Sequence, residues 1–257
     1  MWRYGLRGSF IVTAFIFATG QAQADDVLYK REALWRIVST QCVPARQAGQ
    51  PPNPCLTVTD GDDAGYAILK DRVGVAQVLV IPTKQISGIE SPDAREAPSK
   101  KFWAAAWSAR YFLFGYLQRE IARDEVSMAV NSQHDRSQDQ LHIHVDCIKP
   151  LVRDLLRKHA DEIGLDWGLL PFDVDGKKYT ARRLDDPDLS RTNPIALISD
   201  ELSGAASDMG AETIFVAGAK FGDGKEGFIL LEDRAGRTPL DNGHGEDLQD
   251  HSCGVAH

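Results

Sequence analysis

Residues 140–148, Gln-Leu-His-Ile-His-Val-Asp-Cys-Ile, alternate strictly between polar and apolar side chains. Alternation with a period of two predicts a half-buried β-strand. The polar face of this strand carries His142 and His144 side by side. Imidazole is both a nucleophile and a proton carrier near neutral pH. The strand therefore presents a phosphate-attacking histidine, two ligands of a metal, or an ordinary polar surface.

The residues around the two histidines give little support to a metal site. Such a site needs three or more converging ligands. A cupin-type pattern would place a glutamate three or four residues after the second histidine, where Cys147 and Ile148 stand. A two-histidine phosphoesterase would repeat His-x-Ser/Thr, and the chain has no such pair. We expect no metal and no required cofactor, although ligation by the two histidines and a remote third group stays open.

The composition of the chain narrows the class of partner. The chain has 257 residues, enough for a sizeable core, and a formal net charge of −8. It has no basic run and no stretch in which aromatic and basic residues interleave. Nucleic-acid-binding surfaces are typically basic. We therefore expect no nucleic-acid partner.

The first 24 residues have the pattern of a targeting segment. Arg3 and Arg7 precede an apolar run at 10–18, and Ala22-Gln23-Ala24 is an Ala-x-Ala processing site. The run is shorter than the ~20 residues that a spanning helix needs. We predict a cleaved signal peptide or, alternatively, an uncleaved membrane anchor at 1–24, followed by a single domain at 25–257. In either case the domain is expected to be exported.

The four cysteines agree with export, because an even number in an exported protein indicates disulfides. Cys42 and Cys55 flank a loop rich in proline and glutamine. Closing that loop could stabilise the fold by about 3 kcal/mol. By elimination Cys147 would pair with Cys253 and tie the C-terminal region to the histidine strand. The alternative is that Cys147 is a buried free thiol.

Apolar spacing predicts helices at 27–41, 100–119 and 151–163. The helix at 100–119 is rich in aromatic residues, which are expected to pack in the core; an apolar trough for a lipid chain is the alternative. Strands are predicted at 65–70, 75–81, 125–131, 140–148, 179–184, 214–218 and 227–232. Helices combined with meandering strands indicate an α+β fold.

A polar loop at 132–139 joins the strand ending at Asn131 to the histidine strand. Hairpin geometry would bring Asn131, Arg136 and Ser137 close to the two histidines. Such a set suits attack on phosphorus, because an imidazole nitrogen can form a phosphoramidate while neighbouring donors hold the phosphate oxygens. We identify His142 and His144 as candidate catalytic residues, the second of which could bind phosphate or move a proton.

The histidine strand resembles the histidine-triad motif His-φ-His-φ-His-φ-φ, whose middle histidine attacks a nucleoside phosphate. Other segments resemble the bacterial CDP-diacylglycerol pyrophosphatases, and the four cysteines stand where that family has them. These segments are 81–92 (IPTKQISGIESP), 102–110 (FWAAAWSAR), 181–183 (ARR) and 248–253 (LQDHSC). The likeness covers nearly all of the chain after the targeting segment.

The resemblance implies a histidine-triad-like antiparallel sheet with packed helices and an additional C-terminal α/β portion. It also implies hydrolysis of CDP-diacylglycerol to phosphatidate and CMP at the periplasmic side of the inner membrane. His142 matches the nucleophile and His144 the third histidine, while Asn131 and Ser137 match phosphate-contacting or orienting positions. Gln140 stands where the triad has its first histidine. Glutamine forms hydrogen bonds but carries no proton, so Gln140 is expected beside the phosphate.

Two other functions stay open at this point. The replacement of a histidine by Gln140 could slow release of the intermediate to water and favour CMP transfer to an acceptor alcohol. The aromatic helix would also suit a non-enzymatic periplasmic protein that binds lipid or nucleotide.

Overall fold

A computed structural model of the chain describes Met1 and residues 27–61, 63–239 and 241–256. Apart from Met1, the predicted signal peptide or anchor at 1–24 lies outside the described residues. Among the described helices, none combines the length and the apolar composition that a membrane span requires.

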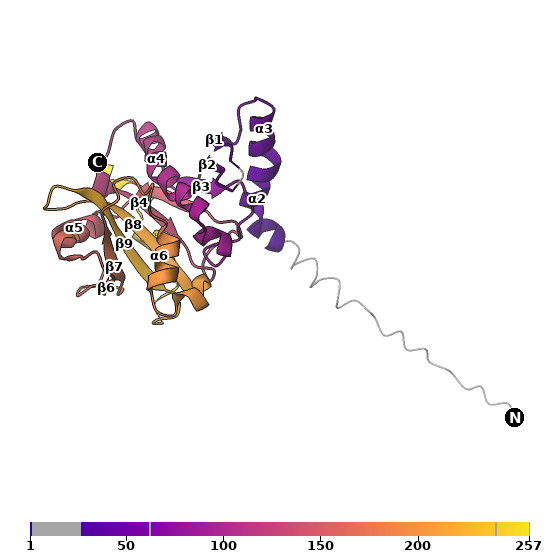
Figure 1. Ribbon diagram of the computed structural model, residues 1–257. Coiled ribbons are helices and arrows are strands. Elements are labelled where there is room, and N and C mark those ends of the chain that lie inside the picture. Colours follow the sequence, from indigo (N-terminus) through magenta and orange to yellow (C-terminus); the bar gives the residue numbers. More distant parts are fainter. Residues whose placement is uncertain (2–26, 62, 240, 257) are drawn as a thin grey trace.

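A single sheet of nine strands forms the centre of the molecule, in the order β1-β2-β3-β5-β4-β8-β9-β7-β6 (Figure 1). Every pair of neighbouring strands is antiparallel. The strands are β1 (Cys55–Thr59), β2 (Tyr66–Lys70), β3 (Val78–Pro82), β4 (Val126–Val130), β5 (Ile143–Cys147), β6 (Gly168–Leu169), β7 (Thr180–Leu184), β8 (Glu212–Lys220) and β9 (Glu226–Arg234). The α+β prediction is confirmed, with one difference: the C-terminal strands extend the same antiparallel sheet and do not form a separate α/β portion.

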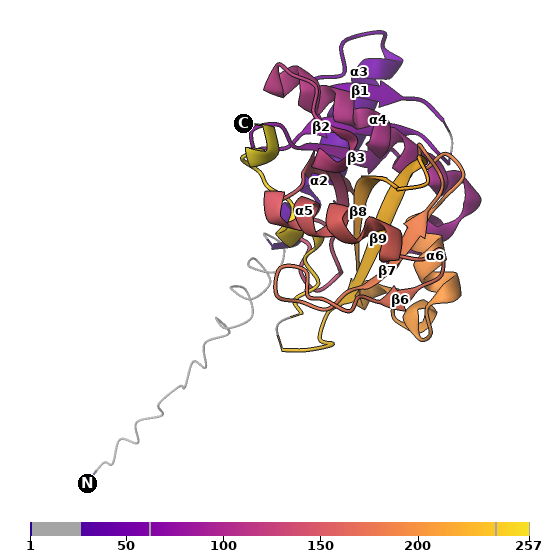
Figure 2. The ribbon, with the colours of Figure 1, turned by 90° about the vertical axis from the view of Figure 1, so that its left-hand side faces the viewer.

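Helices lie on both faces of the sheet (Figures 1 and 2). The α-helices are α2 (Ala33–Ile37), α3 (Val43–Gln47), α4 (Lys100–Leu117), α5 (Pro150–His159) and α6 (Pro194–Glu201). A π-helical turn η1 (Val38–Cys42) joins α2 to α3, and residues 27–31 are also helical. The 3-10 turns are η2 (Pro92–Arg95), η3 (Ala97–Ser99), η4 (Arg123–Glu125), η5 (Ala160–Glu162), η6 (Ala205–Ser207), η7 (Met209–Ala211), η8 (Gly245–Leu248) and η9 (Gly254–Ala256).

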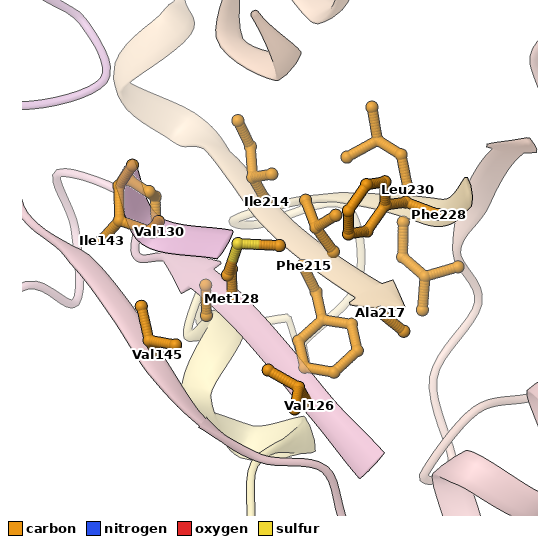
Figure 3. Close-up of a cluster of buried hydrophobic side chains, with 14 of the residues drawn as sticks. Val126, Met128, Val130, Ile143, Val145, Ile214, Phe215, Ala217, Phe228 and Leu230 are labelled. Atoms are coloured by element: carbon orange, nitrogen blue, oxygen red, sulfur yellow. The ribbon is translucent and has the colours of Figure 1, made fainter. Parts of the chain in front are cut away.

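Helix α4 covers one face of the central strands. Phe102, Trp103 and Trp107 are buried in the main apolar core, together with alternate side chains of β3 and β5 such as Val80 and Val145. Figure 3 shows how this core continues across β4, β8 and β9. The prediction that the aromatic rings pack in the core is confirmed for these three.

The helical segment 27–47 covers the opposite face at the β1–β3 end of the sheet. Leu34 and Val38 pack there against Leu79 and Ile81, the β3 side chains that point away from α4. The Cys42–Cys55 disulfide fastens this segment to β1, as predicted. The face that carries the histidines is therefore this one, because Leu79 pairs directly with His144 across the β3–β5 ladder.

Most predicted elements are confirmed with shifts of a few residues at their ends. Strands β1 and β6 were not predicted. Strand β1 follows directly after the disulfide loop and has no clear alternation, since its burial pattern runs buried, intermediate, intermediate, buried, exposed. Strand β6 has only two residues, too few for a periodic pattern.

Candidate active site

Strand β5 occupies a central place in the sheet, between β3 and β4. His144 lies within it and His142 directly precedes it, and their ring centroids are 4.6 Å apart. The prediction of a half-buried strand is wrong, because every residue of β5 is buried. His142 is only 7% exposed and His144 5%. The polar face is not open to solvent because a second segment covers it.

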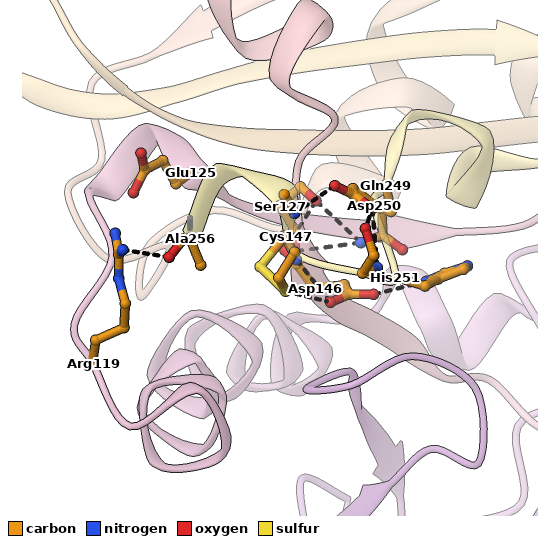
Figure 4. Close-up of a disulfide and its surroundings, with 12 residues drawn as sticks. Arg119, Glu125, Ser127, Asp146, Cys147, Gln249, Asp250, His251 and Ala256 are labelled. Atoms are coloured by element: carbon orange, nitrogen blue, oxygen red, sulfur yellow. Dashed lines mark hydrogen bonds and ion pairs between the residues drawn. A yellow bond between two sulfur atoms is a disulfide. The ribbon is translucent and has the colours of Figure 1, made fainter.

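That cover is the C-terminal segment 244–253. It is joined to the end of β5 by the Cys147–Cys253 disulfide and by a bridge between Ile148 and Gln249 (Figure 4). Gln249 donates hydrogen bonds to the Oγ of Ser127 on β4 and to the backbone carbonyl of His144. The predicted second disulfide is confirmed, and it places polar residues of the C-terminal segment directly over the histidines.

The ring of His142 is held by a backbone carbonyl two residues earlier in the chain. Its Nδ1 lies 2.6 Å from the carbonyl oxygen of Gln140, and a carbonyl only accepts, so the ring proton is on Nδ1. Burial, together with the adjacent His144, lowers the pKa of His142 to about 3. The ring is therefore neutral at pH 7, with the lone pair on Nε2. That is the form of imidazole that attacks an electrophile.

His144 is held differently, by a carboxylate. Its Nδ1 lies 2.9 Å from Oε2 of Glu246 and 2.8 Å from Nε2 of Gln77, which also donates to that oxygen at 2.9 Å. Burial raises the pKa of Glu246, but His144 and the donors Gln77 and Asn131 outweigh it and hold the pKa well below its usual range. The carboxylate is thus ionised. Nε2 of His144 is buried and has no hydrogen-bond partner among the described residues.

Asn131 lies where the hairpin predicted, but its amide is turned toward the C-terminal segment. Its Nδ2 donates to Oε1 of Glu246 at 2.7 Å, and its Oδ1 accepts from the backbone N–H of Gly245 at 2.8 Å. Both ends of the amide are therefore used. Asn131 acts on His144 through Glu246.

Arg136 stabilises the loop at 132–139 through ion pairs. It pairs with Glu90 and with Asp139, which in turn pairs with Arg31 at 2.7 Å. A Cβ at Gly88 would come within 2.0 Å of the Arg136 guanidinium, so the glycine makes room for it. Because two carboxylates already share this guanidinium, the structure gives it the part of a loop anchor rather than a free phosphate donor.

The predicted placement of Gln140 on the open polar face is also wrong. Gln140 is fully buried. Its Nε2 donates to the carbonyls of Pro82 and Lys84, and its Oε1 accepts from the N–H of Ile86. The amide therefore ties the 82–86 backbone to the start of the histidine strand. Ser137 is exposed, at the outer side of the same loop.

Within the described chain, one group of residues has the spacing of metal ligands: Asp146, Cys147 and Cys253. Both sulfurs belong to the disulfide, so neither is a thiolate ligand. Asp146 instead contacts Nδ1 of His251 at 2.7 Å (Figure 4). Burial raises the pKa of Asp146, and the Asp146 contact raises that of His251.

Sequence reasoning missed Glu246 and Gln77. Both are far from the histidine strand along the chain, and neither is part of a local pattern. The sole hint was the predicted Cys147–Cys253 disulfide, which implied that residues shortly before Cys253 lie near the strand.

Comparisons with known proteins identify the family of the chain. Residues 29–257 match a family model described as CDP-diacylglycerol pyrophosphatase. The chain is also 41% identical over 224 residues to a CDP-diacylglycerol pyrophosphatase of Yersinia pestis, which covers 87% of this chain and 84% of the relative. The range matched by the family model includes both histidines, the loop before them and the C-terminal segment that covers them. The chain therefore belongs to the CDP-diacylglycerol pyrophosphatase family.

Proposed function

We propose that the protein hydrolyses the pyrophosphate bond of CDP-diacylglycerol to phosphatidate and CMP, with His142 as the nucleophile. The observation that carries this proposal is the hydrogen bond from Nδ1 of His142 to the Gln140 carbonyl. It fixes the tautomer, and the low pKa of about 3 keeps the ring uncharged. Family membership supports the choice of substrate.

The proposed reaction has two displacements at the same phosphorus. Nε2 of His142 attacks the phosphorus of the CMP unit, and the bond to the bridging oxygen breaks. Phosphatidate leaves with that oxygen and its electron pair, and a cytidylyl-histidine remains. Water then attacks the phosphorus and gives up a proton, the P–N bond breaks, and its electron pair returns to Nε2 as CMP departs. No metal or cofactor takes part in this scheme.

Donors for the phosphate oxygens are available in the loop before His142. The backbone N–H groups of Ser137, Gln138 and Gln140 donate no hydrogen bond to the described residues. Backbone N–H groups are effective partners for charge that develops on oxygen. We assign phosphate binding to this stretch of loop and to the Ser137 hydroxyl. The side chains of Asn131, Arg136 and Gln140 do not contact the phosphate in this proposal; they hold Glu246, the loop and the 82–86 backbone in place.

Hydrolysis is favoured over CMP transfer. The case for transfer depended on a Gln140 amide beside the nucleophile, and that amide is turned into the 82–86 backbone. A lipid trough along α4 is also disfavoured, because α4 packs on the face of the sheet opposite to the histidines.

The acyl chains of the substrate require a lipid surface near the site, and we place it at the start of the helical segment 27–47. Val27, Leu28 and Tyr29 are exposed there, at 56%, 53% and 62%. Two residues later, Arg31 contacts Asp139 and the backbone carbonyl of Arg136 in the loop at 132–139. The apolar run at 10–18 precedes this point in the sequence. We therefore propose that the protein is exported and acts at the membrane surface on the periplasmic side, with the loop at 132–139 toward the lipid.

Trapping the covalent intermediate tests the nucleophile. Protein mixed with CDP-diacylglycerol labelled in the CMP phosphate is quenched without acid, because phosphoramidates are acid-labile, and the labelled peptide is mapped. We expect label on His142 in the wild type. His142→Ala should retain no label and lose at least about 1000-fold in kcat, since the nucleophile is removed.

His134→Ala is the matched control, because His134 is exposed on the same loop. It should keep both label and turnover. Full turnover by His142→Ala, or label on another residue, would exclude the proposed mechanism.

A further inference from the structure

Two histidines share one face of the sheet, yet they are held by partners of opposite character. His142 has a neutral carbonyl as its partner, and His144 has an ionised carboxylate together with the amide of Gln77. A carboxylate next to an imidazole stabilises the imidazolium that forms when both ring nitrogens are protonated. The geometry therefore suits His142 to attack and His144 to carry a proton.

Hydrogen bonds from two side chains hold the Glu246 carboxylate in place. It is 12% exposed at its side chain and accepts from Gln77 through Oε2 and from Asn131 through Oε1. Asn131 also holds Gly245, the residue before it. A buried carboxylate with this many donors stays ionised and has little freedom to move.

Among the described residues, Oε1 of Gln77 is one buried polar atom of this network without a partner, and Nε2 of His144 is the other. It is fully buried, and nothing within the described residues bonds to it. A buried polar nitrogen without a partner carries a desolvation cost unless something else pairs with it. The ring of His142, the proposed nucleophile, is the immediate neighbour of His144, with the ring centroids 4.6 Å apart.

We propose that Glu246 is a positioning residue that makes His144 the proton carrier of the reaction. This inference rests on the proposed function and deepens it. Protonated His144 gives its Nε2 proton to the bridging oxygen as the P–O bond breaks, so phosphatidate leaves protonated. Neutral His144 then takes a proton from the attacking water as the P–N bond breaks. Glu246 stays ionised throughout, and its charge stabilises His144 while His144 is protonated.

Few other charges act on His144. Asp146 lies on the same strand and is paired with His251, while His142 is uncharged. His244 lies 3.5 Å from Oε1 of Glu246. The neighbours on the adjacent strands, Leu79 on β3 and Ala129 on β4, are apolar. Among the described residues, Glu246 is therefore the carboxylate that contacts His144.

The test is Glu246→Gln, assayed for kcat, KM and the pH dependence of kcat. We expect kcat to fall about 100-fold near neutral pH, which is within the usual range for loss of a proton carrier. KM should change less than about threefold. The pH dependence of kcat should also change, because a charge 2.9 Å from Nδ1 is lost. A merely structural role would not change it.

Asp247→Asn is the matched control. Asp247 is the next residue on the same turn, pairs with Lys177 and is 36% exposed at its side chain. It should keep the wild-type kcat and pH profile. A folded Glu246→Gln enzyme with kcat within threefold of wild type and an unchanged profile overturns the inference. Absence of wild-type turnover on CDP-diacylglycerol would instead overturn the proposed function.

Glutamine at 246 would face the Nδ2 of Asn131 with a second donor, which could unfold the turn. The double variant Glu246→Gln with Asn131→Asp restores an acceptor there and keeps one for Gly245. We expect it to fold with a wild-type melting temperature while kcat stays at least about 30-fold low. Recovery of kcat to within threefold of wild type would show that the charge is not needed at residue 246, and would overturn the assignment to the Glu246 carboxylate.

Discussion

Two covers lie side by side on the histidine face of the sheet, and they differ in polarity: the first is apolar and the second is polar. The helical segment 27–47 covers β1–β3 with apolar side chains such as Leu34 and Val38. The C-terminal segment 244–253 covers β5 and β4 with Glu246, Gln249 and His251. Each cover is fastened to the strand below it by one disulfide.

This difference indicates which of the two covers can be mutated without loss of turnover. Apolar contacts are non-directional, so the first cover can adjust to a lost methyl group with a moderate cost. Buried polar groups need a partner at a fixed place, and each lost partner leaves an unpaired group behind. We therefore expect damage to the first cover to lower stability alone, and damage to the second to lower turnover as well.

Removal of the Cys147–Cys253 disulfide should have the largest effect. Cys147→Ala with Cys253→Ala opens a loop of 106 residues, which is expected to cost about 5 kcal/mol of unfolding free energy. The loosened segment would also hold Glu246 less firmly, so kcat should fall at least about tenfold. Urea unfolding and turnover at a temperature where the variant is folded measure the two effects. An unchanged kcat would show that the second cover works without its tether.

Removal of the Cys42–Cys55 disulfide is the counterpart on the first cover. Cys42→Ala with Cys55→Ala opens a loop of 13 residues and should cost about 3 kcal/mol. The kcat of the folded variant should stay within twofold of wild type, as measured by the same pair of assays. A large loss of turnover would mean that the two covers are coupled, and the comparison would fail.

Val38→Ala tests the apolar cover at a single residue. Val38 is fully buried, and loss of its two methyl groups should lower the unfolding free energy by about 2 kcal/mol. Turnover should not change. Chemical denaturation gives the stability, and a cost below about 0.5 kcal/mol would indicate that the cover rearranges to fill the space.

The smallest effect is expected at the outer end of the polar cover. The Asp146 contact raises the pKa of His251, so the pair adds stability below about pH 6.5 that is lost as the pH rises through the raised value. His251 is 35% exposed at its side chain, which limits this contribution to less than about 1 kcal/mol. The unfolding free energies of wild type and His251→Gln should therefore converge as the pH is raised. A gap that widens with pH would contradict the assignment.

The sequence alone predicted the histidine strand, both disulfides and the aromatic helix, because each depends on a local pattern or on a count of cysteines. It did not predict that the histidine face is covered, since Glu246 and Gln77 reach His144 only through the sheet order and the second disulfide. It also placed Gln140 and Arg136 beside the phosphate. Their side chains instead bind the backbone at 82–86 and the carboxylates of Glu90 and Asp139, partners that composition and spacing do not reveal.

The order of the disulfides along the chain has a consequence for biosynthesis. The two pairs are consecutive rather than interleaved, since Cys42 and Cys55 both precede Cys147 and Cys253. If oxidation follows the order in which the cysteines emerge, the first pair closes before a third sulfur is present to compete. Native pairing then needs no reshuffling, and Glu246 meets His144 only when residues made about a hundred positions later have arrived.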